Sequence, residues 1–318
     1  MRFFIFNYEN NSNLIDSFLS SACRAHGYDE PLSRGWFIWK FRDNPYGPTI
    51  LTCAEEDGVI VGCVGYGFQP FILNGKTLNG VMSFETFVHP DYQRRGIFSK
   101  LIKLAEIQLV EQKVDFILNF PNSNSLKGFL NSGWKQNPAP EYRIKFNNII
   151  NSMIHINDFR SEFISKYKNN REIYGFNNFD QVNNDYFYLK LNKEFINWRF
   201  FSYPLHEYYK IEKDSYQAVV KVGYRGKIKE GHILFINISD NKTFSMNDLI
   251  KECKNIKDLD VLSLSVSKVN GLRSQILRHG FVRVPSKVRM CYKILNNLNI
   301  RDSDISNLSF EGIYHHTN

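Results

Sequence analysis

The sequence Val88-His89-Pro90-Asp91-Tyr92-Gln93-Arg94-Arg95-Gly96-Ile97-Phe98-Ser99 decides the fold, because it joins a predicted strand to a predicted long helix. The run before it, GVMSFETFV (residues 80–88), has the β-branched and aromatic residues of a strand. The run after it, through residue 112, sets apolar side chains on one helical face, namely Phe98, Leu101, Ile102, Leu104 and Ala105.

The loop between these two elements has the properties of an anion site. The first N–H groups of a helix lack backbone partners and its dipole is positive at that end, so a pyrophosphate fits there. Gly96 lets the backbone approach a ligand closely, and Arg94 and Arg95 add positive charge. One glycine and two arginines also suit a plain connection with a basic, solvated turn, so the loop alone leaves both interpretations open.

The segments around this loop predict a complete mixed domain. Helices are expected at residues 11–25 and 33–42, the second ending before Asn44-Pro45 because the residue before a proline avoids the helical region. Residues 50–56 and 59–68 form a predicted hairpin about Asp57-Gly58. There follow an apolar strand at 114–120, a short helix at 124–134 ended by Gly133, and the last strand of this domain at 141–147.

The sequence from residue 186 onward resembles the first part in one motif and in the order of its predicted elements. WKFRDNP at residues 39–45 corresponds to WRFFSYP at residues 198–204, with the same offset at both ends: 198 − 39 = 159 and 204 − 45 = 159. Strands at 217–225 and 231–239, a helix at 244–256, a strand at 261–267 and a helix at 270–281 follow in the matching order. The sequence thus predicts a domain at 1–150, a connection at 151–185, a second domain at 186–300 and a C-terminal tail at 301–318.

Composition excludes several classes of protein. Lys and Arg number 40 and Asp and Glu 32, and the net charge of +8 suits coenzyme phosphates; without a basic stripe, nucleic acid is not expected. The five cysteines are odd in number and have no C-x-x-C spacing, so neither disulfides nor a metal site is expected, and a cytoplasmic location is. No apolar run approaches the ~20 residues that cross a membrane, and no signal-peptide pattern is seen.

Together with its neighbouring elements, the loop resembles the GNAT acyltransferase superfamily. The family motif is Val-x-Pro, then Gln/Arg-x-x-Gly-x-Gly/Ala opening a long helix; here stand Val88-x-Pro90 and Gln93-x-x-Gly96-x-Phe98. The family's later Asn, small residue, aromatic residue and Gly-Phe correspond to Asn122, Ser125, Phe129 and Gly133-Trp134. The resemblance covers residues 1–145 and implies an α/β (α+β) fold of two tandem GNAT-like domains, each a mixed, mostly antiparallel sheet flanked by helices. Residues 39–47 and 119–125 further resemble acyltransferases of surface-polysaccharide gene clusters.

The resemblance implies that the loop amides bind the pyrophosphate of acetyl-CoA or another acyl-CoA, and that the end of strand 80–88 pairs with the pantetheine arm. The implied coenzyme-binding residues are Phe87, Val88, Gln93, Arg94, Arg95, Gly96, Ile97, Phe98, Ser99, Asn122, Ser125 and Phe129. Two of them depart from the family pattern. Phe98 replaces Gly or Ala, and Phe129 replaces the Tyr that many relatives use as general acid, because a phenyl ring has no proton to donate.

The implied reaction is direct attack of an acceptor amine on the acyl thioester, which needs a base and donors for the developing oxyanion. Glu85, three residues before Val88 on the same strand, is the candidate base, with an ordinary surface carboxylate as the open alternative. Asn119, at the end of strand 114–120, is the second candidate catalytic residue, as a contact to pantetheine or acceptor. A backbone N–H near Val88 is expected to serve the oxyanion.

The predicted function is therefore N-acyl transfer from an acyl-CoA, with acetyl-CoA as the expected donor, to a small-molecule amine such as an amino sugar or its nucleotide conjugate. Two alternatives stay open: a protein or peptide N-acyltransferase, and an acyl-CoA-binding protein whose catalysis has decayed. The second domain lacks a glycine loop before helix 244–256, so we expect it to shape the acceptor cleft. A monomer or homodimer is expected, without a metal, membrane or nucleic-acid partner.

Overall fold

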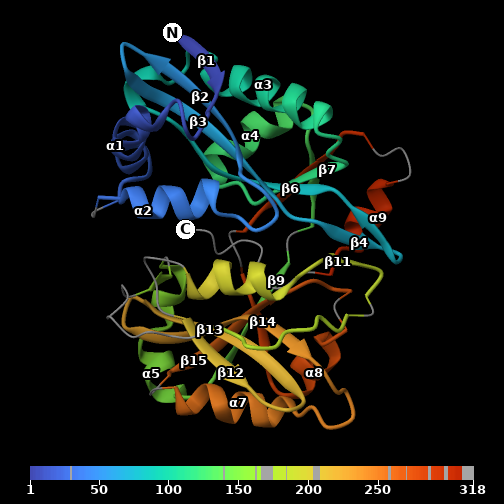
Figure 1. Cartoon of the computed structure of the whole chain (residues 1–318). Helices are drawn as coiled ribbons and strands as arrows, with labels where there is room; N and C mark the ends of the chain where they lie inside the picture. Colours follow the sequence, from blue (N-terminus) through green and yellow to red (C-terminus); the bar gives the residue numbers. More distant parts are fainter. Residues whose placement is uncertain are drawn as a thin grey trace. The chain divides into compact units, whose positions relative to one another are not determined.

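The structure is a computed structural model that describes residues 1–28, 31–138, 140–161, 163–165, 175–183, 185–202, 208–256, 259–269, 271–285, 288–296 and 300–309 (Figure 1). Its backbone contacts divide the chain into two compact units. Unit 1 consists of Met1–Pro138 and Val288–Ser306, and unit 2 of Ala139–Lys287 and Asn307–Asn318.

Unit 1 is built on a seven-stranded sheet in the order β1-β2-β3-β6-β7-β17-β8. Neighbouring strands are antiparallel except for β6 and β7, which are parallel. The strands are β1 (Arg2–Ile5), β2 (Ile50–Glu56), β3 (Val59–Phe68), β6 (Gly80–Val88), β7 (Phe116–Asn119), β8 (Lys135–Asn137) and β17 (Met290–Ile294), with β4 (Phe71–Leu73) and β5 (Lys76–Leu78) forming a separate hairpin.

Helices cover both faces of this sheet (Figure 1). The helices α1 and α2, with η2, lie on one face, and α3 and α4 on the other; the apolar side of α3 packs Ile97, Leu101 and Ile102 onto the strands. The helices are η1 (Ser12–Leu14), α1 (Ile15–His26), α2 (Arg34–Phe37), the π-helix η2 (Ile38–Arg42), η3 (Pro90–Tyr92), α3 (Ile97–Glu111), α4 (Ser123–Asn131) and α9 (Asp302–Ser306).

Unit 2 is built on a seven-stranded sheet in the order β10-β13-β14-β15-β9-β16, in which β12 also pairs with β13. Here β14 and β15 are the parallel neighbours and the other pairs are antiparallel. The strands are β9 (Glu141–Phe146), β10 (Ile164–Ser165), β11 (Phe187–Leu189), β12 (Tyr208–Glu212), β13 (Tyr216–Arg225), β14 (Ile228–Ile238), β15 (Val261–Val266) and β16 (Val282–Val284). The helices are α5 (Ile149–Ile154), η4 (Ile156–Arg160), α6 (Lys193–Ile196), the π-helix η5 (Asn197–Phe201), α7 (Met246–Asn255) and α8 (Arg273–Arg278).

The predicted fold class is confirmed: mostly antiparallel mixed sheets are flanked by helices. The repeated aromatic motif also folds alike in its two copies. The helical segments 34–42 and 193–201 each pass from an α-helix into a π-helix at the same offset of 159. Their N-caps match as well, because Ser33 accepts from the backbone N–H of Trp36 and Asn192 from that of Phe195.

The strand at 141–147 corrects one expectation, because it does not end the sheet of unit 1. This strand, β9, lies between β15 and β16 in unit 2, while β17, from near the end of the chain, fills the matching place between β7 and β8 in unit 1. Pro138 and Pro140 favour extended backbone after β8 and lack N–H groups, so the sequence there does not encode a tight return.

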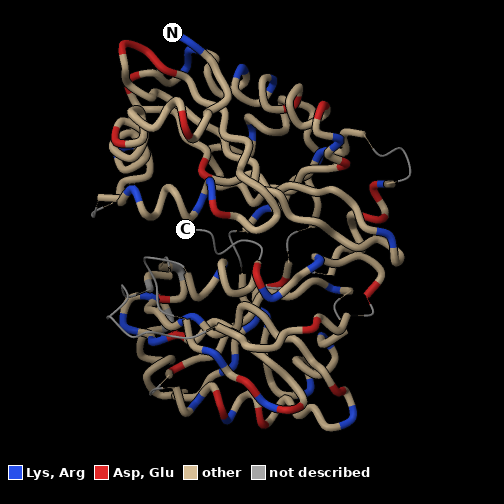
Figure 2. The backbone as a smooth tube through the Cα atoms, viewed as in Figure 1, with Lys and Arg blue, Asp and Glu red and all other residues tan. Residues whose placement is uncertain are grey.

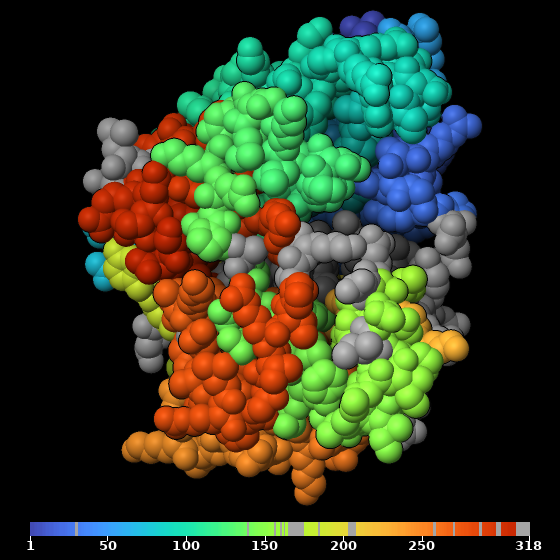
Figure 3. Space-filling view, turned by 180° about the vertical axis from the view of Figure 1, so that it is seen from behind, coloured from blue at the N-terminus to red at the C-terminus, as the bar shows by residue number. Residues whose placement is uncertain are grey.

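The end of the described chain is held in unit 1 by polar contacts. Lys135 Nζ lies 2.6 Å from Asp302 Oδ2, and Asn137 Nδ2 donates to the carbonyl of Ile305 at 3.3 Å. Figure 3 shows this segment, in red, beside the green surface of α4 and β8. The predicted domain boundaries therefore differ from the units of the fold. Of the predicted connection and tail, residues 162, 166–174, 184 and 310–318 lie outside the described residues.

Candidate active site

The loop after β6 is anchored to the sheet and then turns sharply. The backbone N–H of His89 donates to the carbonyl of Val61 on β3 at 2.8 Å. Arg94 and Gly96 have left-handed backbone, with φ of 63° and 73°. A left-handed conformation is costly for most L-residues and free for glycine, which explains why Gly96 stands immediately before α3.

The amino end of α3 is open to an anion. Gly96 is the N-cap and supplies no capping side chain, and a Cβ at this position would meet nothing within 4 Å. In the described part of the chain, no group accepts a hydrogen bond from the backbone N–H of Arg94, Arg95 or Gly96. These donors lie at the positive end of the helix dipole, which is the arrangement that binds phosphate.

The two arginines keep positive charge at this loop. Nη2 of Arg95 donates to the carbonyl of Asp91 at 3.0 Å, and its guanidinium lies 4.7 Å from the ring centroid of Tyr92. Arg94 is exposed. Elsewhere Lys and Arg are interspersed with Asp and Glu along the backbone (Figure 2). The attraction for an anion at the loop therefore comes from Arg94 and Arg95 themselves rather than from a large basic surface.

The parallel strands β6 and β7 part beside this loop. They pair from Gly80 opposite Phe116 to Ser83 opposite Asn119, where β7 ends, while β6 continues to Val88. Among the described strands, none pairs with the edge of β6 from residue 84 to 88 on the side away from β3. Backbone N–H and C=O groups require partners, so this edge offers hydrogen bonds to an extended ligand.

A β-bulge reshapes β6 within the wedge, which is the opening between β6 and β7 after Ser83 and Asn119. Phe84 pairs with Gly65 and Phe87 with Cys63, so Glu85 and Thr86 together face the single residue Val64. Glu85 has left-handed backbone, with φ of 46°, and its carbonyl accepts from the Cys63 thiol at 2.9 Å. Bulges re-aim side chains, and this one turns Glu85 toward α1 and η2.

Glu85 is a buried carboxylate between two basic side chains. Its side chain is 0% exposed; Oε2 accepts from Nζ of Lys40 on η2, and Oε1 lies 3.2 Å from Nε2 of His26 at the end of α1. Burial acts to raise its pKa, but Lys40 and then His26 outweigh burial and lower the pKa to about 2. Glu85 is therefore ionised throughout the physiological range.

Aromatic rings enclose the Lys40–Glu85 pair. Nζ of Lys40 lies 4.6 Å from the ring centroid of Trp36 and 5.6 Å from that of Phe84, and Phe84 stacks on Phe41 at 5.7 Å. Such rings attract a cation and exclude water, and the low local dielectric strengthens the ion pair.

The two residues that depart from the family pattern are packing residues. The rings of Phe98 and Phe129 meet edge to face at 5.0 Å, and Phe129 also packs on Trp134 at 4.8 Å. A Cβ on Gly128 would come 2.4 Å from Cε1 of Phe98, so glycine at 128 makes room for the bulky side chain. Phe129 is fully buried, and Phe98 lies under the start of α3.

Asn122 and Ser125 shape the start of α4. Oδ1 of Asn122 accepts from the backbone N–H groups of Asn124 and Ser125 at 3.0 Å each and from the Ser125 hydroxyl at 3.1 Å. This is an N-cap, and it commits the oxygen of the Asn122 amide, which belongs to an exposed residue.

The predicted site residues thus fall into two groups. The loop residues 93–99 gather at the amino end of α3, beside the free edge of Phe87 and Val88. Glu85 lies on the same edge but its side chain is buried toward α1, and Asn119 is buried where β7 stops. Sequence reasoning missed His26 and Lys40; the one available signal was a charged residue inside an aromatic helix, repeated as Arg199.

Unit 2 has a corresponding parallel pair but different chemistry. The β14–β15 pairing ends at Ile233 opposite Leu264, so the residue in the place of Glu85 is Phe235, two residues after the last pair. The helix that follows, α7, is capped by the Ser245 hydroxyl, which accepts from the Asp248 N–H at 3.3 Å. Asp240, in the loop before α7, accepts from the backbone N–H of Lys242 and from the Thr243 hydroxyl, both at 2.8 Å.

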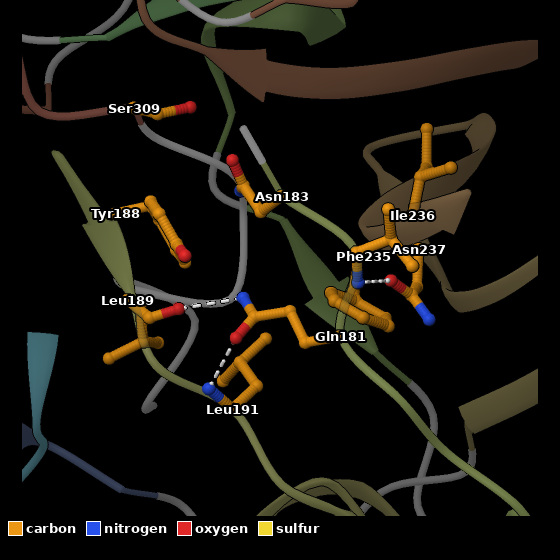
Figure 4. Close-up of a pocket in the computed structure, with 10 residues that line it drawn as sticks. Gln181, Asn183, Tyr188, Leu189, Leu191, Phe235, Ile236, Asn237 and Ser309 are labelled. Atoms are coloured by element: carbon orange, nitrogen blue, oxygen red, sulfur yellow. Dashed lines mark hydrogen bonds between the residues drawn. The ribbon is translucent and has the colours of Figure 1, made fainter. Parts of the chain in front are cut away.

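A pocket beside β14 in unit 2 is filled by internal hydrogen bonds (Figure 4). Gln181 donates to the carbonyl of Leu189 and accepts from the N–H of Leu191, and Asn237 accepts from the N–H of Val182. The cavity of about 20 Å³ holds about one water molecule. These amides are structural, and the pocket is too small for a coenzyme.

The described residues contain no cluster of three or more His, Cys, Asp or Glu side chains that suits a metal ion. Among the same residues, no helix is both long enough and apolar enough to span a bilayer.

Comparisons with known proteins agree with this geometry. Residues 13–129 match the model of the acetyltransferase (GNAT) family. A GCN5-related N-acetyltransferase from Anabaena variabilis has a similar structure, with a TM-score of 0.64 and 11% identity over 93% of this chain and 73% of that one. Saccharomyces cerevisiae N-myristoyltransferase with bound myristoyl-CoA gives a TM-score of 0.54 and 13% identity, covering 93% of this chain and 78% of that one. No curated protein matches the sequence.

At these identities the solved structures establish the fold alone, whereas the family match extends over α1, η2, the bulged strand β6 and the α3 loop. Residues 13–129 therefore resemble a domain of the acetyltransferase (GNAT) family.

Proposed function

We propose that unit 1 transfers an acyl group from acyl-CoA, with acetyl-CoA as the donor, to the amino group of an acceptor. One observation carries the proposal: the parallel strands separate after Ser83 and Asn119 beside a helix whose amino end has open N–H groups. The wedge offers a backbone edge to an extended arm, and the helix offers donors to a pyrophosphate, so together they match the two parts of a coenzyme A molecule.

The residues of the loop would hold the coenzyme. The N–H groups of residues 94–99 would donate to the pyrophosphate, with Arg94 and Arg95 adding charge, and the edge at Phe87 and Val88 would pair with pantetheine. The NH₂ group of Asn122 would donate to the coenzyme, since its oxygen is already used as the helix cap.

The proposed chemistry is attack of the amine nitrogen on the thioester carbon, with loss of one amine proton and departure of the thiolate. A backbone N–H near Val88 would stabilise the oxyanion. Phe129 has no proton for the thiolate, which would leave unassisted, because a thiol with an ordinary pKa of about 8.5 gives a tolerable leaving group. Asn119 remains a proposed contact to pantetheine or the acceptor, and Glu85 is proposed to assist proton removal from its buried position rather than by touching the substrate.

For the acceptor, we propose a small-molecule amine, such as an amino sugar or its nucleotide conjugate. A peptide amine is the second candidate acceptor. Unit 2, without a glycine loop or a counterpart of Glu85, is proposed as a degenerate GNAT-like domain that contributes to acceptor binding. A cytoplasmic protein acting as monomer or homodimer is part of the same proposal.

A transfer assay tests the function. Purified full-length protein is mixed with acetyl-CoA and a panel of amino sugars, their nucleotide conjugates and short peptides, and release of free CoA is followed with the mass of each acceptor. The proposal expects one acceptor class to gain about 42 Da, because an acetyl group replaces one hydrogen of the amine. CoA binding with no transfer to any amine would favour the decayed-enzyme alternative.

A further inference from the structure

His26, Glu85 and Lys40 form a cluster in which only the imidazole reaches solvent. The side chains of Glu85 and Lys40 are 0% and 5% exposed, whereas that of His26 is 22% exposed. A group that exchanges a proton with a substrate must be reachable by it. Of the three, His26 alone meets this condition.

The contact between His26 and Glu85 fixes which ring nitrogen is available. Nε2 of His26 and Oε1 of Glu85 are both buried and lie 3.2 Å apart as an ion-pair contact, and among the described residues neither atom has a partner with hydrogen-bond geometry. A carboxylate oxygen accepts only, so Nε2 carries a hydrogen toward Glu85. Nδ1 is then the ring nitrogen left for a substrate, because the exposed part of the side chain lies on the atoms other than Nε2.

Packing places the ring beside the proposed thioester site. The imidazole meets the ring of Phe87 edge-on at 5.9 Å and stacks on Tyr28 at 5.3 Å. Phe87 belongs to the edge of β6 that has no strand partner in the described structure, which is the edge proposed to hold the acyl-pantetheine arm. His26 therefore packs against a residue of that edge, between two rings and beside a carboxylate.

We propose that His26 takes the proton from the acceptor amine, and that Glu85 is a positioning residue that holds its ring. This inference rests on the proposed acyl transfer. As the nitrogen–carbon bond forms, the amine proton moves to Nδ1 of His26, the carbon–sulfur bond breaks, and its electron pair leaves on the CoA thiolate. The imidazolium then returns the proton to solvent or to the thiolate, so the products are the amide and CoA thiol.

The charged surroundings agree with this division of roles. Glu85, with its pKa lowered to about 2 by Lys40 and His26 against the effect of burial, stays an anion and is a weak proton acceptor. Among the described residues, the groups that face the imidazole from neighbouring elements are Glu85 on β6, with Lys40 behind it on η2, and the Tyr28 ring after α1. Histidine is the side chain that exchanges protons near neutral pH.

The test compares the pH dependence of kcat/KM between variants. In the wild type, the logarithm of kcat/KM should fall on the acid side with a slope of two, one proton from the acceptor ammonium and one from the imidazolium. His26→Gln keeps a donor toward Glu85 but has no proton acceptor, so the slope should become one and activity should fall by roughly 10²–10⁴-fold. Glu85→Gln should lower activity yet keep the slope of two.

Controls separate this inference from the function beneath it. His279→Gln removes another histidine at a helix end, in unit 2, and should leave the profile unchanged. Added imidazole should restore part of the activity of His26→Ala. A slope of two in His26→Gln, or its loss in Glu85→Gln alone, would overturn the role of His26. Failure of the proposed function shows separately, as a wild-type protein that does not bind acetyl-CoA.

Discussion

Ser83 and Asn119 are the last paired residues of two parallel strands, and everything proposed for the coenzyme arm depends on the separation that follows them. Asn119 is 6% exposed and ends β7 at the opening of the wedge. We propose that its amide bonds the arm, so Asn119→Ala should raise the KM for acetyl-CoA by roughly 2–10-fold, the value of one neutral hydrogen bond.

Steady-state kinetics with varied acetyl-CoA measure this effect. Asn131→Ala, at the exposed end of α4, is the matched control and should leave KM unchanged. An unaltered KM in Asn119→Ala would remove this residue from the coenzyme site.

Restoring the family's tyrosine should not restore a general acid. Phe129 is fully buried between Phe98 and Trp134, so the hydroxyl of Phe129→Tyr would enter an apolar cluster. We expect the free energy of unfolding to fall by about 1–3 kcal/mol and kcat to stay the same or decrease. Urea unfolding and kcat measure the two effects; a higher kcat would show that residue 129 reaches the leaving group.

The Lys40–Glu85 pair should dominate the stability of unit 1. Lys40→Met leaves a buried carboxylate without its nearest cation, and breaking a buried pair typically costs about 3–5 kcal/mol. The double variant Lys40→Met/Glu85→Gln removes the uncompensated charge and should recover much of this loss. Arg34→Met, which breaks the exposed pair with Asp16, is the control and should barely move the urea midpoint. Equal effects of Lys40→Met and Arg34→Met would contradict the buried pair.

The same pair predicts how stability depends on pH. The folded-state pKa of Glu85, about 2, lies below its ordinary value of 4.5, so the stabilisation is complete above pH 4.5 and is lost as the pH falls through 2. The contribution is on the order of 3 kcal/mol, and Glu85→Gln should flatten this part of the curve. Identical acid unfolding of the wild type and Glu85→Gln would refute the assignment.

Local sequence patterns predicted the helices and strands well, but they did not predict contacts between residues far apart in the sequence. The loop from Val88 to Ser99, the helix it opens and the repeated aromatic helix follow from turn residues and apolar spacing, which act within a few residues. Glu85 contacts Lys40 and His26, which precede it by 45 and 59 positions in the sequence. These contacts depend on a bulge that no sequence pattern in β6 indicates.

Strand placement escaped prediction for a similar reason. The strand at 141–147 and the strand at 290–294 have ordinary β patterns, and neither pattern states which sheet receives it. If each strand is assigned to the domain that precedes it in the sequence, β9 falls in the first domain and β17 in the second. In the structure, β17 lies in the sheet of unit 1 and β9 in the sheet of unit 2.

This exchange makes a prediction about fragments. Without β17, the strand β7 loses a neighbour paired over four residues, from Phe116 to Asn119, and β8 loses its attachment to the sheet. A fragment of residues 1–138 should therefore lack cooperative thermal unfolding, and a peptide of residues 288–306 should restore it. Circular dichroism measures both; a fragment 1–138 that melts cooperatively alone would show that β17 is dispensable.

The central claim is that the amino end of α3 binds the pyrophosphate of an acyl-CoA, and calorimetric titration of acetyl-CoA tests it most directly. Gly96→Asp sets a negative charge at the proposed phosphate position, in open space and with left-handed backbone that Asp tolerates. Gly75→Asp is the matched control, because Gly75 has φ of 76° and also has no atom within 4 Å of an added Cβ.

We predict that the wild type and Gly75→Asp bind acetyl-CoA equally, and that Gly96→Asp weakens binding at least ~10-fold, or about 1.4 kcal/mol. Equal affinity of Gly96→Asp and Gly75→Asp, or no binding by the wild type, would contradict the account.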